Sequence, residues 1–291
     1  MKIYKGRAFT SKEKIEGKKV IGNPASIVVC SKEFPDQKEM GEIAIKEKQP
    51  MTAFVKQNKN GEKFDIDYFA PNGTRFNLCG HATLVTAYFL NKLYGYQDLI
   101  FHLHHKTEEL SSEFIQSSLL NNGIVRISIP SFIPDLATNE DCINNYTKAF
   151  NLDKKDVQNF YYCKELKDFI IVLMKKNKIR YVEPNLNLLS KTSKKHSIRG
   201  VFITSKSENK NIDYEIRIFA PHLGINEDIS CCSANCSLLP LWSHILNIKN
   251  EKESQILCPY NTRNTGFGGL EFGYYDHKKS RIHIGGFVKE F

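Results

Sequence analysis

Two cysteines follow the same short motif, and both could take part in acid–base chemistry. Phe69-Ala-Pro71 leads through a polar loop to Cys79, and Phe219-Ala-Pro221 leads through a polar loop to Cys231. Each cysteine has an alanine three positions later and then a helical pattern, and the two copies lie about 150 residues apart. The repeated order predicts two structurally similar halves.

Each half should deliver its cysteine to the start of a helix. The N-terminus of a helix carries unpaired N–H groups and positive dipole charge, so a thiol there is expected to have a lowered pKa and a carboxylate is expected to bind nearby. If the halves face each other, Cys79 and Cys231 approach one substrate from opposite sides. Two acid/base groups on opposite faces of one carbon suit racemisation or epimerisation.

Other roles for the cysteines stay open. A free cysteine is often a small buried apolar residue. Cys231, Cys232 and Cys236 have no standard zinc spacing. We therefore predict no metal site.

The cysteines need strands and helices to hold them. Residues 82–94 form a helical pattern that is apolar nearly all round, which predicts a buried helix. Ser233 to Leu246 predicts a second helix, and residues 31–49 contain helical spacing after Pro35. Runs with strand character are residues 22–30, 52–55, 63–70, 123–129, 159–174, 200–204, 214–219, 268–275 and 281–291.

Composition excludes several classes of protein. The chain has 291 residues, of which 41% are apolar and 25% charged, as in an ordinary globular protein. No apolar run approaches the roughly 20 residues that cross a bilayer, and the first residues show no signal peptide. The formal net charge is +9, but the lysines are scattered, so we expect neither nucleic acid nor membrane as a partner. A reduced, cytoplasmic protein is predicted.

The motifs resemble the phenazine-biosynthesis-like (PhzF) family, which shares its fold with diaminopimelate epimerase. The matching stretches are Gly22-Asn-Pro-Ala25, Thr52-Ala-Phe-Val55, Cys79-Gly-His-Ala-Thr-Leu84, Phe219-Ala-Pro221, Gly224-Ile-Asn-Glu-Asp228, Ser233-Ala234, Trp242 and Gly285-Gly286. The resemblance implies an α/β (α+β) fold of two pseudo-symmetric halves, each a curved, mostly antiparallel sheet around a central helix. It also implies metal-free isomerase chemistry without pyridoxal phosphate or another cofactor, in a homodimer.

Departures from the family pattern favour a cysteine mechanism. The family has a catalytic Glu where this chain has Met51, and Glu47 is off register. In diaminopimelate epimerase a Cys-Gly motif follows a Gly-Ser-Glu turn, and the second Cys lies four residues after a Glu. Here Asn72-Gly-Thr-Arg75 precedes Cys79, and Cys231 lies four residues after Glu227. The chain thus resembles a PhzF-type sequence with an epimerase-type cysteine pair.

Further residues are expected to bind the substrate. Arg75 is the candidate for selecting an anionic side chain, and His81 and Asp228 could bind substrate or act as acid and base. Each also has a plain structural alternative, such as a surface arginine or a helix cap. The full predicted set of substrate-binding residues is Asn23, Asn72, Arg75, Gly80, His81, Glu227, Asp228, Cys232 and Ser233.

These observations lead to one main hypothesis and two alternatives. The chain is predicted to be an amino-acid racemase or epimerase that uses Cys79 and Cys231 on a small carboxylate-bearing substrate. The alternatives are a PhzF-type isomerase of a cyclic metabolite that uses His81 and Asp228, and a binding or scaffold protein that kept the fold. The halves are expected at residues 1–118, to which a strand at about 281–291 could return, and 119–280, with the active site in the cleft between them.

Overall fold

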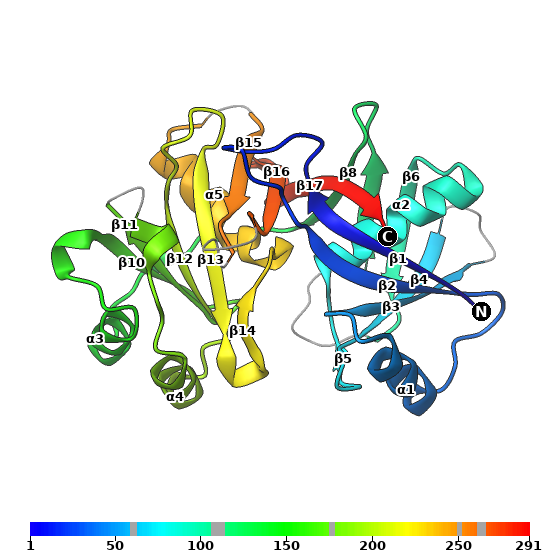
Figure 1. Cartoon of the computed structure of the whole chain (residues 1–291), viewed down its shortest axis with the longest axis horizontal. Helices are drawn as coiled ribbons and strands as arrows, with labels where there is room; N and C mark the ends of the chain where they lie inside the picture. The colour runs from blue at the N-terminus through cyan, green and yellow to red at the C-terminus, as the bar shows by residue number, and fades with distance from the viewer. Residues whose placement is uncertain (59–62, 106–113, 175–177, 249–251, 261–265) are drawn as a thin grey trace.

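The chain folds as a mixed α+β structure with two lobes side by side (Figure 1). The computed structural model describes residues 1–58, 63–105, 114–174, 178–248, 252–260 and 266–291. The first lobe is drawn blue to cyan and the second green to orange (Figure 1). The fold class predicted from the sequence is confirmed.

The elements follow one another along the chain in two parts. The first part contains β1 (Lys2–Thr10), β2 (Asn23–Cys30), α1 (Gln37–Glu47), β3 (Thr52–Gln57), β4 (Lys63–Phe69), β5 (Arg75–Phe76), α2 (Gly80–Tyr94), β6 (Asp98–Leu103), β7 (Phe114–Leu119) and β8 (Ile124–Pro130). The second contains β9 (Asp135–Leu136), α3 (Glu140–Ala149), η1 (Lys154–Asp156), β10 (Val157–Cys163), β11 (Asp168–Leu173), η2 (Lys178–Tyr181), α4 (Leu186–His196), β12 (Gly200–Lys206), β13 (Tyr214–Ala220), η3 (Pro221–Leu223), β14 (Ile225–Asp228), η4 (Cys232–Ala234), α5 (Asn235–Ile245), β15 (Ser254–Cys258), β16 (Gly269–Asp276) and β17 (Arg281–Glu290).

The two lobes repeat one pattern of strand pairing. In the first lobe β1 pairs antiparallel with β2, β2 parallel with β3, β3 antiparallel with β4, β4 parallel with β6, and β6 antiparallel with β7. The strands β10, β11, β12, β13, β15 and β16 repeat this series in the same order. Each Phe-Ala-Pro motif lies at the end of the equivalent strand, β4 or β13, so the predicted duplication is confirmed.

The last strand joins the lobes. β17 pairs with β16 and β8 along its first half and with β1 toward its end. With β17 in place, the pairings β1–β2–β3–β4–β6–β7–β8–β17–β1 form a closed ring. β7 spans residue 118, and the domain boundary expected there stays a prediction.

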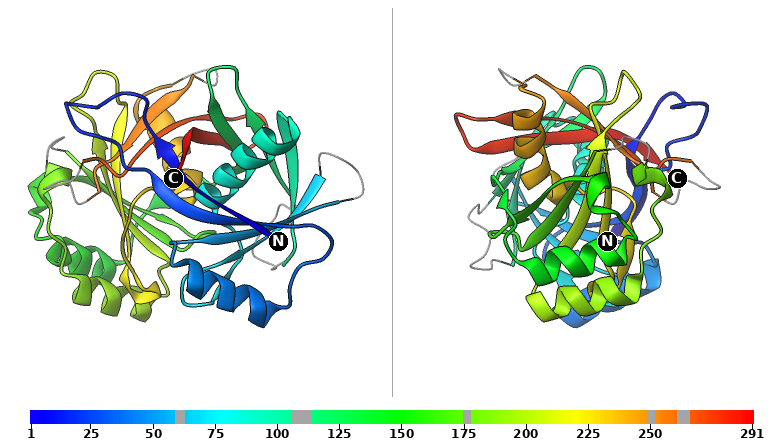
Figure 2. Two further views of the ribbon diagram at one scale, coloured as in Figure 1. Left: turned by 45° about the vertical axis from the view of Figure 1, so that its right-hand side comes forward. Right: turned by 90° about the vertical axis from the view of Figure 1, so that its left-hand side faces the viewer.

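The central helices form the core. α2 packs against β1, β2, β3, β7, β8 and β17, as its all-round apolar sequence predicts. α5 contributes Leu238, Leu239 and Trp242 to the same apolar cluster. The amphipathic helices α1, α3 and α4 lie together along one side of the molecule (Figures 1 and 2), where α1 covers Phe54 and α3 and α4 pack on each other.

Within the described residues, every helix is too short or too polar to cross a membrane. The cytoplasmic location and the homodimer stay predictions.

Candidate active site

The backbone places Cys79 and Cys231 in matching positions. Cys79 precedes α2 with φ −141° and ψ 102°, and Cys231 precedes η4 with φ −138° and ψ 107°. The carbonyl of Cys79 accepts a hydrogen bond from the N–H of Thr83, and that of Cys231 accepts one from Ala234. The sequence repeat is therefore also a repeat of backbone conformation, and each cysteine stands at a helix start.

The two helix starts touch each other. A Cβ atom added to Gly80 would lie 2.4 Å from Cβ and 2.6 Å from Sγ of Cys232, so only glycine fits there without a shift. Cys79 and Cys231 both line one cleft of about 1620 Å³, whose walls come from both lobes. The arrangement brings both thiols to one cleft.

The cleft collects most of the residues expected from the sequence. Met51 also lines it, at the position where the resemblance expects a Glu. The predicted residues in the lining are Asn23, Asn72, Cys79, Gly80, His81, Glu227, Asp228, Cys231, Cys232 and Ser233.

Arg75 and Glu47 lie elsewhere among the described residues. Arg75 forms an ion pair with the buried carboxylate of Asp67 at 2.8 Å and is absent from the described cleft lining. The carboxylate of Glu47 accepts a hydrogen bond from Ser26 at 3.0 Å and pairs with Lys5 at 2.9 Å. Glu47 therefore does not replace the carboxylate that the resemblance expects at position 51.

Cys79 has a histidine beside it. Sγ of Cys79 lies 3.3 Å from Nδ1 of His81. Burial lowers the pKa of His81 to about 4, and a hydrogen bond with the Pro24 backbone opposes this effect. At neutral pH the imidazole is therefore uncharged, and a neutral ring has one nitrogen that can accept a proton.

Cys231 has a carboxylate and a hydroxyl beside it. Its Sγ lies 3.2 Å from Oγ of Ser233, and Asp228 is close enough to raise the pKa of Cys231 further. Burial raises the pKa of Asp228 to about 6, and hydrogen bonds from Ser230 N–H and Asn23 Nδ2 oppose this. Asp228 is therefore mostly ionised at neutral pH but holds its proton more tightly than an exposed Asp.

The expectation that the helix starts lower the pKa of the thiols is wrong. Burial raises the pKa of Cys79 well above its usual range, and it raises the pKa of Cys231 to about 12. The backbone N–H groups of Ala82 and Ala234 act in the opposite direction but do not prevail. Loss of water from the thiolate outweighs the partial charges of the helix ends.

The structure adds a residue that the sequence does not suggest. Arg199 lines the cleft and donates from Nη1 to Oγ of Ser233 at 3.1 Å. Its Nε and Nη2 donate to the fully buried carboxylate of Asp168 at 3.0 and 2.5 Å. Burial raises the pKa of Asp168 to about 6, although Arg199 opposes this. Arg199 thus stands two hydrogen-bond lengths from the sulfur of Cys231.

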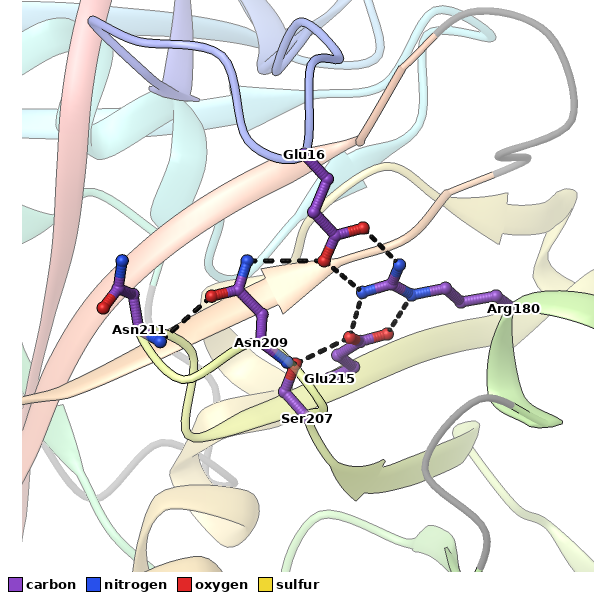
Figure 3. Close-up of polar contacts among 6 residues, drawn as sticks. All are labelled: Glu16, Arg180, Ser207, Asn209, Asn211 and Glu215. Carbon is purple, nitrogen blue, oxygen red and sulfur yellow. Dashed lines mark hydrogen bonds and ion pairs between the residues drawn. The ribbon is translucent and has the colours of Figure 1, made fainter.

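Two other arginines of the cleft are held by carboxylates. Arg217 donates to both oxygens of Glu227 at 2.7 and 2.9 Å and also to the carbonyls of Ile179 and Val182. Figure 3 shows Arg180 between Glu16 and Glu215, with Asn209 and Ser207 completing the cluster. Glu16 comes from the loop between β1 and β2, so this cluster also ties that loop to η2 and β13 of the second lobe.

A buried carboxyl group contacts residues on both sides of η4. Glu271 is fully buried and contacts Oγ of Ser230, Nδ2 of Asn235 and Sγ of Cys258. Burial raises the pKa of Glu271 to about 7. Among the described residues, no group of three or more His, Cys, Asp or Glu side chains is arranged to hold a metal ion.

Comparisons with known proteins agree with this architecture. Residues 8–287 match the model of the family described as phenazine biosynthesis-like protein. An uncharacterized isomerase from Halalkalibacterium halodurans is 30% identical over 237 residues, which cover 79% of each chain.

Solved structures show the same fold. A putative phenazine biosynthesis PhzC/PhzF protein from Clostridium difficile superimposes with a TM-score of 0.78 at 23% identity, covering 99% of this chain and 96% of the other. A hydroxyproline epimerase from Agrobacterium vitis, solved with bound trans-4-hydroxy-L-proline, gives a TM-score of 0.56 at 9% identity and covers 99% of this chain and 91% of the other.

Proposed function

Because the chain belongs to the phenazine biosynthesis-like protein family, we propose that it is an isomerase that inverts the carbon next to a carboxylate, with Cys79 and Cys231 as its acid/base pair. One observation carries the proposal. Two cysteines with matching backbone conformation stand at touching helix starts and line the same cleft. An amino acid is the favoured substrate, and no cofactor is needed.

The reaction removes one proton from the reacting carbon and adds one proton to the opposite face of that carbon. The thiolate of one cysteine takes the proton from the reacting carbon, so that a C–H bond breaks and an S–H bond forms. The electron pair spreads into the substrate carboxylate, which the N–H groups of the helix starts stabilise. The thiol of the other cysteine then gives its proton to the opposite face, which inverts the centre and leaves the two sulfurs with exchanged protonation states.

Each thiol has a polar neighbour that can form a hydrogen bond with it. His81 lies beside Cys79, and Asp228 lies beside Cys231. Because the pKa of each thiol is raised, the thiolate is a minor form at neutral pH. It is also a strong base, which suits the very weakly acidic proton of an amino acid.

A second candidate function follows from the same neighbours. The pKa of Asp228 is about 6, so this carboxyl group can exchange a proton near neutral pH without help from a thiol. His81 and Asp228 could then move a proton within a cyclic metabolite. In that case Cys79→Ser would leave activity largely intact.

Proton NMR in deuterated buffer tests the proposal. Free amino acids, with trans-4-hydroxy-L-proline among them, are incubated with the wild type, Cys79→Ser, Cys231→Ser and the control Cys142→Ser, whose cysteine lies in the separate apolar cluster under α3. We expect one amino acid to lose its α-proton signal with the wild type and the control, and each active-site variant to abolish the exchange or restrict it to one enantiomer.

Other outcomes decide between the alternatives. Full exchange in both serine variants would exclude the cysteine pair and favour His81 and Asp228. No exchange across the panel with a folded wild type would refute amino-acid inversion. It would leave an isomerase of another substrate or a protein that only binds.

A further inference from the structure

The repeat that makes the cysteines equivalent also pairs two very different residues. Met51 immediately precedes β3, and Arg199 immediately precedes β12, the strand that takes the place of β3 in the second lobe. Both residues line the cleft. At this pair of equivalent positions the cleft is therefore apolar on one side and positively charged on the other.

Hydrogen bonds fix one edge of the Arg199 guanidinium group. Nε and Nη2 grip Asp168, which has no exposed surface, and Nε also donates to the carbonyl of Leu166 at 3.1 Å. These contacts and the one with Ser233 use three of the five N–H groups of the guanidinium. One N–H on each terminal nitrogen has no partner among the described residues, and 38% of the side chain is exposed.

Arg199 differs in this respect from the neighbouring arginines. The guanidinium of Arg217 is held by Glu227 and two carbonyl groups, and that of Arg180 by Glu16 and Glu215. In Arg199, one edge of the guanidinium is held by Asp168, and further N–H groups can donate to a ligand. A planar guanidinium in this state is well suited to bind a second carboxylate.

We propose that Arg199 is the specificity residue of the cleft and binds a second carboxylate of the substrate, which makes the substrate a short dicarboxylic amino acid. The identification of the substrate as an amino acid rests on the proposed function, whereas the binding of a carboxylate by Arg199 does not. It gives Arg199 the task that the sequence analysis expected of Arg75.

Distances limit the length of this substrate. Nη1 of Arg199 lies 3.1 Å from Oγ of Ser233, which lies 3.2 Å from Sγ of Cys231. The reacting carbon must come within about 3.5 Å of that sulfur. Nη1 of Arg199 and Sγ of Cys231 are therefore at most about 6.3 Å apart, and this short separation favours a spacer of one or two methylene groups, as in the four- and five-carbon dicarboxylic amino acids.

Binding of unreactive probes tests the inference without any need for catalysis. Succinate, glutarate and the monocarboxylate butyrate are titrated into the reduced protein by calorimetry. We expect the dicarboxylates to bind the wild type roughly ten- to hundredfold more tightly than butyrate, the range of a charge-assisted hydrogen-bond pair.

The variants must not leave Asp168 buried without a partner. The double variant Asp168→Asn/Arg199→Gln removes both charges and keeps groups that can hydrogen-bond, and thermal unfolding checks that it folds. We expect it to lose the preference for dicarboxylates. Lys194→Met, which removes an exposed cation from the same cleft lining, should keep it.

The outcomes distinguish the carboxylate site at Arg199 from the proposed isomerase reaction. Equal binding of butyrate and glutarate by the wild type would overturn the inference. The inference would also be overturned if the folded double variant kept the preference for dicarboxylates, or if Lys194→Met lost it. An Arg199-dependent preference without α-proton exchange of aspartate or glutamate would support the anion site and count against the proposed function. Exchange of both amino acids and not of their amides would support both.

Discussion

Replacing Glu271 by glutamine should make the protein more stable at high pH and leave its stability unchanged at low pH. Glu271 is fully buried, and its pKa is raised from 4.5 to about 7 because burial disfavours the charged form. A glutamine resembles the protonated acid. Its NH₂ group can donate to Oγ of Ser230 while its oxygen accepts from Nδ2 of Asn235, which now donates to Glu271 at 2.6 Å.

The size of the effect follows from the two pKa values. Below pH 4.5 the carboxyl group is protonated in both the folded and the unfolded chain, so it contributes no pH dependence. Between 4.5 and about 7 the unfolded chain loses this proton first, and rising pH therefore favours unfolding. At about 1.4 kcal/mol for each unit, the full penalty above pH 7 comes to about 3 kcal/mol.

Urea unfolding at pH 4.5, 6, 7 and 8 measures this difference. We expect Glu271→Gln and the wild type to unfold with equal free energy at pH 4.5, and the variant to gain up to about 3 kcal/mol by pH 8. Glu290→Gln is the control, because a hydrogen bond with Lys92 lowers the pKa of Glu290. In this case the stability of the wild type relative to the variant should increase as pH rises. A difference between Glu271→Gln and wild type that stays constant with pH would refute the reasoning.

Two further predictions concern the junction of the helix starts. Gly80→Ala should cost about 1–3 kcal/mol of unfolding free energy, because its Cβ would overlap Cys232; adding Cys232→Gly should restore most of it, and an additive loss would contradict the contact. Because the pKa of Cys231 is about 12, its iodoacetamide alkylation, followed by mass spectrometry, should be slower than that of glutathione at pH 7 and rise about tenfold per pH unit up to pH 9. A plateau below pH 9 would contradict the raised pKa.

The sequence predicted those parts of the fold whose signals are local or repeated. The apolar pattern of residues 82–94 is sufficient to indicate a buried helix, and α2 occupies Gly80–Tyr94. The Phe-Ala-Pro repeat was enough to pair Cys79 with Cys231. By contrast, the strand expected over residues 159–174 is a hairpin of β10 and β11. Its turn contains Lys167 with φ 56° instead of glycine or asparagine, so the sequence carries no turn signal.

The features that were missed depend on contacts between distant parts of the chain. Arg199 and Asp168 are 31 residues apart and meet because β11 and β12 pair in parallel, which places Asp168 beside Gly200. Neither residue belongs to a motif. The raised pKa of the thiols was missed for a similar reason, since the helix starts are visible in the sequence but the depth of burial around them is not.

The strand β17 has a consequence for how the protein is made. Residues 281–290 of β17 supply the neighbour of β1, the first strand, and of β8 and β16. During synthesis the first lobe therefore emerges with two unpaired strand edges, and these stay open until β17 has left the ribosomal exit tunnel. Unpaired edges invite pairing with other chains. The nascent protein is thus exposed to aggregation until β17 is available, and this strand then joins both lobes in one step.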